Sequence, residues 1–168
     1  MTVSRRTILT ATALSAAAAA QAQRRYANWK PKLGCLAVYS ESNIDFIKAE
    51  GFTSVQLRIN PNQVDDAAIA NIKRKLQSSG LYVSSLACDG NHIDPDPAAR
   101  DKQNTYTVKC IELCGKLGIP AIGGQSGTIK GRPLAEQVDQ IVKVYNEKYF
   151  PALEKNKVRI LWEPYAGG

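Results

Sequence analysis

Zinc-type ligand patterns and nucleotide-binding loops are both missing from this sequence of 168 residues. It contains one histidine, His92, and four cysteines, and no two cysteines are spaced as C-x-x-C. The histidine is not positioned to complete a set of cysteine ligands, which argues against a structural zinc site. The glycine patterns G-x-x-x-x-G-K-[ST] and G-x-G-x-x-G are also absent, which argues against the two common phosphate-binding loops.

The four cysteines are predicted to be buried free thiols rather than disulfides. Cys35 and Cys88 fall inside predicted buried strands. Cys110 and Cys114 lie four residues apart, which places both on one face of a predicted helix that also carries Ile and Leu. Free cysteine is among the most often buried residue types, so thiols in the core are the simpler interpretation.

A membrane-spanning segment is also missing, because the apolar stretch at residues 11–20 is shorter than the about 20 residues that a span requires. This stretch follows the pair Arg5-Arg6 and precedes Ala20-Gln21-Ala22, an A-x-A cleavage sequence. Together these features predict a cleaved signal peptide over residues 1–22, with a frayed Ala-rich helix as the alternative. The paired arginines resemble a twin-arginine export signal, which predicts a periplasmic protein.

The composition of the chain is that of a soluble domain with a sizeable core, at 44% hydrophobic and 22% charged residues. Removal of residues 1–22 takes away two arginines and no acid, which lowers the formal charge from +7 to +5. The basic residues are scattered, and Lys73-Arg74-Lys75 is predicted to form the solvated face of a helix. A nucleic-acid groove needs basic residues interleaved with aromatics along one surface, so no nucleic-acid partner is predicted.

After a short extension at residues 23–30, residues 31–168 alternate short apolar runs with longer amphipathic ones, which is typical of one α/β domain with a parallel sheet. Ser42 is the expected N-cap of the first helix, and Pro151 is expected to kink or split the last. The five predicted strands are residues 33–38, 54–59, 81–87, 119–122 and a buried strand at 158–162. The four predicted helices are residues 43–50, 65–78, 98–117 and 134–156.

The loops that follow the strands are the expected place for a functional site, because parallel strands bring these loops together on one face. In the loop 89–96, His92 is a candidate to hydrogen-bond a substrate or to transfer a proton near neutral pH. The alternative is a solvated loop histidine. At least one of Asp94 and Asp96 is expected to cap the helix that follows.

The glycine-rich run at residues 123–127 has two interpretations. Backbone N–H groups of such loops bind phosphate, whereas a tight strand-to-helix turn is the simpler explanation here. Glu163 directly follows apolar residues 160–162, where an unpaired carboxylate is costly to bury. A divalent cation, a lysine or an arginine is expected to compensate it, and carboxylate oxygens suit Mg²⁺ or Mn²⁺.

Four stretches also carry a family resemblance. They are residues 51–57 after the first helix, 90–97 after the third strand, 109–120 ahead of the fourth strand, and Leu161-Trp162-Glu163-Pro164 after the fifth. Their succession, over roughly residues 30 to 166, resembles the xylose isomerase-like TIM-barrel superfamily of sugar phosphate isomerases and epimerases.

The resemblance implies an α/β fold, a partial (β/α)8 TIM barrel, and metal-dependent isomerisation or epimerisation of a sugar or sugar phosphate. In that family a Glu after the fifth strand, an Asp after the sixth, a His after the seventh and a Glu after the eighth hold a divalent metal such as Mn or Mg. Only the first of these maps here, onto Glu163, which in epimerases also moves a proton next to a carbonyl. His92 matches a loop histidine near the substrate in several relatives, whereas Gln56 stands where many members carry a Glu.

A complete barrel needs about 250 residues and eight strands, so the chain is expected to be an incomplete, inactive N-terminal fragment of such an enzyme. One alternative is a five-stranded doubly wound domain that binds an anion, and another is an exported barrel-like protein that binds sugars without turning them over. The strand order 1-2-3-4-5 favours a partial barrel, and 2-1-3-4-5 favours the doubly wound domain.

Overall fold

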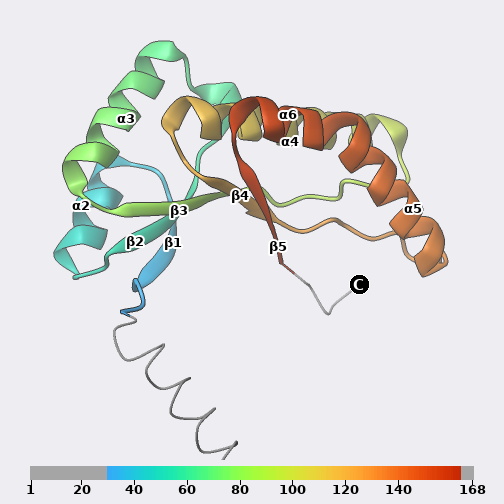
Figure 1. Cartoon of the computed structure of the whole chain (residues 1–168), viewed down its shortest axis with the longest axis horizontal. Coiled ribbons are helices and arrows are strands. Elements are labelled where there is room, and N and C mark those ends of the chain that lie inside the picture. Colours follow the sequence, from blue (N-terminus) through green and yellow to red (C-terminus); the bar gives the residue numbers. More distant parts are fainter. Residues whose placement is uncertain (1–29, 164–168) are drawn as a thin grey trace, which may run out of the picture. The chain divides into compact units, whose positions relative to one another are not determined.

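The computed structural model describes residues 30–163, so the predicted signal peptide and nearly all of the extension at residues 23–30 lie outside it, as do residues 164–168. Its main compact unit begins at Leu33 and contains one five-stranded sheet (Figure 1). Neighbouring strands are all parallel and follow the order β1-β2-β3-β4-β5. The strands are β1 (Gly34–Val38), β2 (Ser54–Arg58), β3 (Tyr82–Ala87), β4 (Ala121–Gly124) and β5 (Arg159–Trp162).

Helices connect successive strands, as expected for βα units. They are α2 (Glu41–Ala49), a short 3₁₀ turn η1 (Pro61–Gln63), α3 (Asp66–Ser79), α4 (Pro97–Leu117), α5 (Leu134–Val144), a π-helical turn η2 (Tyr145–Tyr149) and α6 (Phe150–Asn156). The sequential strand order confirms the predicted α/β fold of a partial (β/α)8 barrel. The doubly wound alternative, which required the order 2-1-3-4-5, is wrong.

The sheet has one face packed against helices and one open face. Leu57, Leu86 and Ile122 are adjacent in register on β2, β3 and β4, and all three are buried in the core. Figure 1 shows α3, α4 and α6 on the same side of the sheet. Because side chains alternate along a strand, the next position of each strand lies on the open face. These positions are Val38, Arg58, Ala87, Gly123 and Leu161.

The first helix begins two residues earlier than the sequence predicts. Its N-cap is Ser40 and not Ser42, because the Ser40 hydroxyl oxygen accepts a 3.1 Å hydrogen bond from the Asn43 N–H. The Ser42 hydroxyl lies 3.0 Å from that of Ser40 and reinforces the cap. At the start of α4, the Asp96 carboxylate accepts a bond from a first-turn N–H, which confirms that one of Asp94 and Asp96 is a cap.

The predicted fourth helix is divided into α5, η2 and α6. Residues 134–156 are helical without a break, because Val144, Tyr145, Tyr149 and Phe150 all have αR backbone angles. Pro151 lies in the first turn of α6, directly after the π-helical turn, so the expected disturbance at this proline is a local change of helix type and not a gap. The π-helical turn that precedes α6 is not predicted from the sequence. It places Tyr145 and Tyr149 in the core, where both side chains are buried.

The last two strands also differ from their predictions. β4 extends to Gly124, and residues 125–133 separate it from α5, so the predicted tight turn at 123–127 is wrong. β5 is not buried, because Leu161 and Trp162 are exposed. Among the described residues β5 pairs with β4 alone, which makes it an edge strand and explains its exposure.

All four cysteines are free thiols, as predicted. Cys88, Cys110 and Cys114 are buried, whereas Cys35 is half-buried. Cys88 lies one residue beyond β3, and its N–H still donates a 2.7 Å bond to the Gly123 carbonyl oxygen of β4. The thiols therefore belong mainly to the packing between the sheet and α4.

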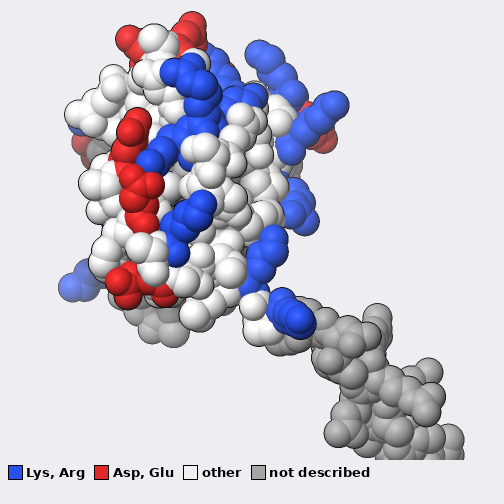
Figure 2. All heavy atoms as spheres, turned by 90° about the vertical axis from the view of Figure 1, so that its left-hand side faces the viewer, with Lys and Arg blue, Asp and Glu red and all other residues white. Residues whose placement is uncertain are grey.

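The basic run on α3 lies largely in solvent, as predicted. Lys73 and Arg74 are exposed, while the Lys75 ammonium lies 2.6 Å from the Asp45 carboxylate of α2. Figure 2 shows the face that carries α2 and α3, with acidic side chains among the basic ones. None of the helices in residues 30–163 combines the length and the apolar character that crossing a bilayer requires.

Candidate functional site

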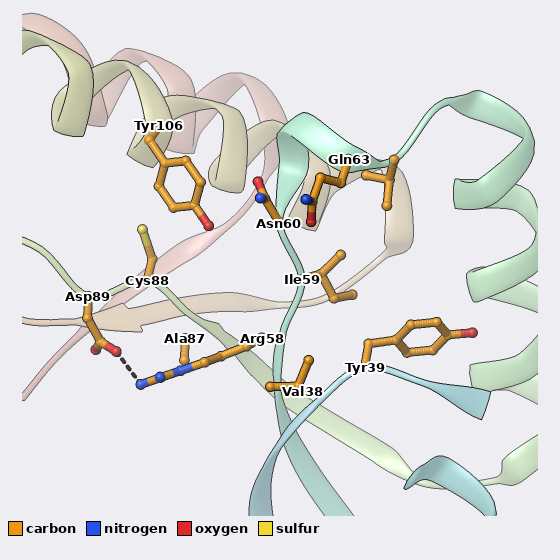
Figure 3. Close-up of a pocket in the computed structure, with 11 residues that line it drawn as sticks. Val38, Tyr39, Arg58, Ile59, Asn60, Gln63, Ala87, Cys88, Asp89 and Tyr106 are labelled. Atoms are coloured by element: carbon orange, nitrogen blue, oxygen red, sulfur yellow. Dashed lines mark hydrogen bonds and ion pairs between the residues drawn. The ribbon is translucent and has the colours of Figure 1, made fainter. Parts of the chain in front are cut away.

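A pocket of about 560 Å³ lies at the carboxyl ends of β1, β2 and β3 (Figure 3). We call it the β1–β3 pocket. Each of the three strands contributes its last residue and the residue after it, and η1 and α4 complete the wall. Its polar side chains are Tyr39, Arg58, Asn60, Gln63, Asp89 and Tyr106. The pocket therefore lies at the sheet edge where the sequence predicts a site.

The two charged groups of the pocket form an ion pair. Arg58 is the last residue of β2 and Asp89 follows β3, and the pair joins Arg58 Nη2 to Asp89 Oδ2 (Figure 3). The side chains are 51% and 46% exposed, so the pair is open to solvent. An ion pair this exposed contributes about 0–1 kcal/mol to stability, so its main consequence is to place one positive and one negative group side by side in the pocket.

The turn that carries Asp89 is held against α4. The backbone carbonyl oxygen of Asp89 accepts a 3.2 Å hydrogen bond from Gln103 Nε2. This approach depends on Gly90, which has φ 151°, because a Cβ at that position would lie 2.1 Å from Gln103 Cδ. The Asp89 carboxylate is thus presented to Arg58 by a backbone that is itself anchored.

Tyr106 closes the pocket from α4 and points its hydroxyl toward Asn60 and Cys88 (Figure 3). Burial raises the pKa of Tyr106 to about 12, so the phenol keeps its proton at neutral pH. It therefore remains a potential hydrogen-bond donor at the pocket wall.

His92 is buried, with 2% of its surface exposed, so the alternative of a solvated loop histidine is wrong. Its Nε2 lies 3.5 Å from the Thr107 hydroxyl oxygen, and that hydroxyl donates its own hydrogen to the Gln103 carbonyl oxygen. A protonated Nε2 that donates to this hydroxyl oxygen fits that arrangement and leaves Nδ1 as an acceptor. Nδ1 is buried and has no hydrogen-bond partner among the described residues.

The surroundings of His92 keep it neutral. Burial lowers its pKa to about 4, because the charged imidazolium is costly to remove from water. The ring packs edge-on against Tyr149 at 5.1 Å between ring centroids and lies 6.2 Å from Tyr145. The backbone N–H of His92 donates a 3.1 Å hydrogen bond to the Ser126 carbonyl oxygen, which connects the loop after β3 to the loop after β4.

Glu163 lies directly after β5, as predicted, but its environment differs from the prediction. Its backbone N–H donates a 3.2 Å bond to the Gly124 carbonyl oxygen, which continues the β4–β5 pairing by one residue. The residue is exposed, so the expected burial of an unpaired carboxylate does not occur. The next two residues of the predicted loop, Pro164 and Tyr165, lie outside the described residues.

The two sequence-predicted site residues lie against the same segment, because the backbone N–H of Glu163 bonds to Gly124 and that of His92 bonds to Ser126. Neither Glu163 nor His92 lines the β1–β3 pocket. The glycine run does not form a phosphate loop, because Gly123 and Gly124 are strand residues, and Gly127 lies beside Asn91 instead.

The Arg58–Asp89 pair is not predicted from the sequence. One signal for it is present, namely a charged residue directly after the buried Leu57 at the end of a strand. Gln56, which departs from the family pattern, lies half-buried on the same face two residues earlier, and its amide nitrogen approaches Gly123.

A metal site needs several ligands, and Glu163 supplies one. Among residues 30–163 no group of three or more His, Cys, Asp or Glu side chains is arranged to hold a metal ion. The described residues therefore do not fit a complete divalent-metal site, although an exposed carboxylate at a strand end is a suitable ligand for Mg²⁺ or Mn²⁺.

Five sequential parallel strands with helices on one face, and polar groups at the carboxyl ends, define the class as a βα-barrel protein. Residues 44–168 match the family described as "Xylose isomerase-like TIM barrel", and the chain belongs to that family. No curated protein matches the sequence.

Solved structures with the same fold include several sugar epimerases. The E. coli 3-keto-D-glucoside 4-epimerase superposes with a TM-score of 0.68 at 16% identity, over 80% of this chain and 56% of the other. D-psicose 3-epimerase from Clostridium cellulolyticum H10 gives 0.63 at 17% identity, over 77% and 51%. A structure of the IOLI protein with a bound zinc atom gives 0.57 at 13% identity, over 76% and 50%. The chain thus spans about half the length of the structures it matches.

Proposed function

We propose that this chain is part of an enzyme that isomerises or epimerises a sugar or sugar phosphate by moving a proton on a carbon next to a carbonyl. The observation that carries the proposal is the place of Glu163 in a chain of this family. It is an exposed residue directly after β5, and its backbone is held there by the bond of its N–H to the Gly124 carbonyl oxygen. A carboxylate in such a place accepts a proton from the substrate and returns it.

His92 is the second residue of the proposal. Its depressed pKa keeps the imidazole neutral above about pH 4, so it acts as a hydrogen-bonding group and not as a general acid at neutral pH. Its Nδ1 has no hydrogen-bond partner among the described residues, but the atom is buried, so the proposed contact of His92 with a substrate rests on the family resemblance and not on its exposure.

A divalent metal, Mn²⁺ or Mg²⁺, is also part of the proposal, with Glu163 as one ligand. A metal bound there polarises a carbonyl oxygen. The bound zinc in the IOLI structure supports metal binding in this fold. Further ligands would have to come from outside residues 30–163, so we derive no step through the metal. The twin-arginine-like signal adds the proposal that the protein is exported to the periplasm.

Solvent proton exchange tests the proposal directly. A full-length version of the protein, with the whole barrel, is incubated in D₂O with Mn²⁺ or Mg²⁺ and a ketose such as D-fructose, and NMR follows the loss of the C–H signal next to the carbonyl. Exchange is expected with the wild type and abolished in Glu163→Gln. Glu136→Gln, an exposed carboxylate on α5, is the matched control and should leave the exchange rate unchanged.

Exchange that persists unchanged in Glu163→Gln would remove Glu163 from the mechanism. Sugar binding with no exchange under any metal would favour the alternative, an exported sugar-binding protein without catalysis.

A further inference from the structure

The β1–β3 pocket carries no net formal charge. Among residues 30–163, Arg58 and Asp89 are the only charged side chains that line it, and they are paired with each other. The remaining polar groups are neutral amides and phenols, among them Asn60, Gln63 and Tyr106. An anionic ligand entering this pocket would meet the Asp89 carboxylate as well as the Arg58 guanidinium, so its attraction to one is offset by its repulsion from the other.

The pair offers both hydrogen-bond donors and acceptors. An arginine has five N–H donors, and the contact with Asp89 is made through one terminal nitrogen, Nη2. A carboxylate accepts several bonds, and Asp89 is about half exposed. A sugar hydroxyl is at once a donor and an acceptor, so two adjacent hydroxyls match a guanidinium and a carboxylate that lie side by side.

The arrangement is held in place before any ligand arrives. Arg58 belongs to β2, whose two neighbours pair with it along the sheet. Asp89 is anchored through its carbonyl oxygen to Gln103 of α4. The backbones of both residues are therefore held in place, and the ion pair brings the two half-exposed side chains together.

From these observations we propose that Arg58 and Asp89 form a hydroxyl-binding site that selects an uncharged sugar over its phosphorylated form. This inference rests on the proposed function, because it assumes that a sugar binds at the carboxyl ends of the strands. It goes further in naming the two residues and the charge state of the substrate.

Paired titrations of the chain with D-fructose and D-fructose 6-phosphate test this inference by calorimetry. The wild type is expected to bind D-fructose more tightly than the phosphate. Asp89→Asn leaves Arg58 unpaired, so it should weaken D-fructose binding by about tenfold or more and reverse the preference toward the phosphate. Arg58→Gln should weaken the binding of both ligands, and of the phosphate most.

The control is Asp139→Asn, which removes an exposed acid of α5, a helix that contributes no residue to the pocket, and it should not change the ratio of the two affinities. If Asp89→Asn fails to fold, the double variant Arg58→Gln/Asp89→Asn restores a neutral pocket. It should bind both ligands weakly without preferring the phosphate.

A wild type that prefers D-fructose 6-phosphate, or that binds neither ligand, would overturn the inference, as would an unchanged affinity ratio in Asp89→Asn. The proton-exchange experiment is a separate readout. If Glu163→Gln exchanges protons as fast as the wild type while the affinity ratios are as expected, the proposed catalysis is refuted and the hydroxyl-binding site is still supported.

Discussion

The Tyr149 hydroxyl donates a 2.6 Å hydrogen bond to Asn104 Oδ1, and both side chains are almost completely buried. The bond joins the π-helical turn η2 to α4. Burial raises the pKa of Tyr149, so the hydroxyl remains a donor throughout the physiological range. A second buried phenol, Tyr145, lies in the same turn, and its hydroxyl has no hydrogen-bond partner among the described residues.

Tyr149→Phe should lower the free energy of unfolding by about 1–3 kcal/mol, because it leaves the buried Asn104 oxygen without its donor. Tyr145→Phe is the matched control, since it removes a buried hydroxyl that makes no bond, and it should be neutral or stabilising. Urea unfolding followed by circular dichroism measures both. An equal decrease in the free energy of unfolding in the two variants would show that the Tyr149–Asn104 hydrogen bond does not stabilise the fold.

Much of the fold follows from the sequence, because its strands and helices are dictated by local patterns. The apolar run that contains Val55 and Leu57, and the helix stop at Gly80 with φ 72°, are typical signals, and the structure has both where they were expected. The N-cap at Ser40 was missed because Ser42 offers the same chemistry two residues later. The π-helical turn was missed because its pattern is that of an ordinary helix.

The site was less predictable, because contacts between distant residues decide it. Glu163 was correctly placed after β5, yet its exposure depends on the edge position of that strand. The burial of His92 depends on packing against Tyr149, more than 50 residues away in sequence. The Arg58–Asp89 pair joins the last residue of β2 to the loop after β3, and no local pattern specifies such a pairing.

The depressed pKa of His92 predicts a stability that falls toward acid pH. The folded-state pKa is about 4 and the ordinary value is 6.5, so between these values the unfolded chain binds the proton and the folded chain does not. The free energy of unfolding is therefore unaffected by His92 well above pH 6.5. It falls as the pH is lowered through this value, by about 2 kcal/mol between pH 7 and pH 5. The titratable groups that pack on the ring are the phenols of Tyr145 and Tyr149.

His92→Gln removes the titrating group, so the variant should lose less stability than the wild type over the same interval. Urea unfolding at pH 7, 6 and 5 gives the two slopes, and the difference between them isolates His92 from the carboxylates that titrate in both proteins. Parallel slopes would mean that His92 is accessible to protons in the folded chain.

Two adjacent glycines of β4 should respond very differently to alanine. A Cβ at Gly124 would lie 2.0 Å from the Cys88 carbonyl oxygen, which is backbone of the neighbouring strand, so β3 and β4 would have to separate locally. A Cβ at Gly123 would lie 2.9 Å from Gln56 Nε2, the movable end of a side chain. Gly124→Ala should cost about 3 kcal/mol or more and Gly123→Ala less than about 1.5 kcal/mol, measured by thermal unfolding. The reverse order would contradict the described packing.

The open face of the sheet should make the chain self-associate. Leu36 on β1 is 51% exposed, and Leu161 on β5 is also largely exposed, both on the face without helices. Exposed apolar groups arranged along one sheet face promote association between copies. Leu36→Lys and Leu161→Lys should therefore shift sedimentation-velocity profiles toward the monomer, with unfolding free energies within about 0.5 kcal/mol of the wild type. Phe46→Lys, at an exposed apolar position on α2, is the control and should have a smaller effect, because it lies away from that face.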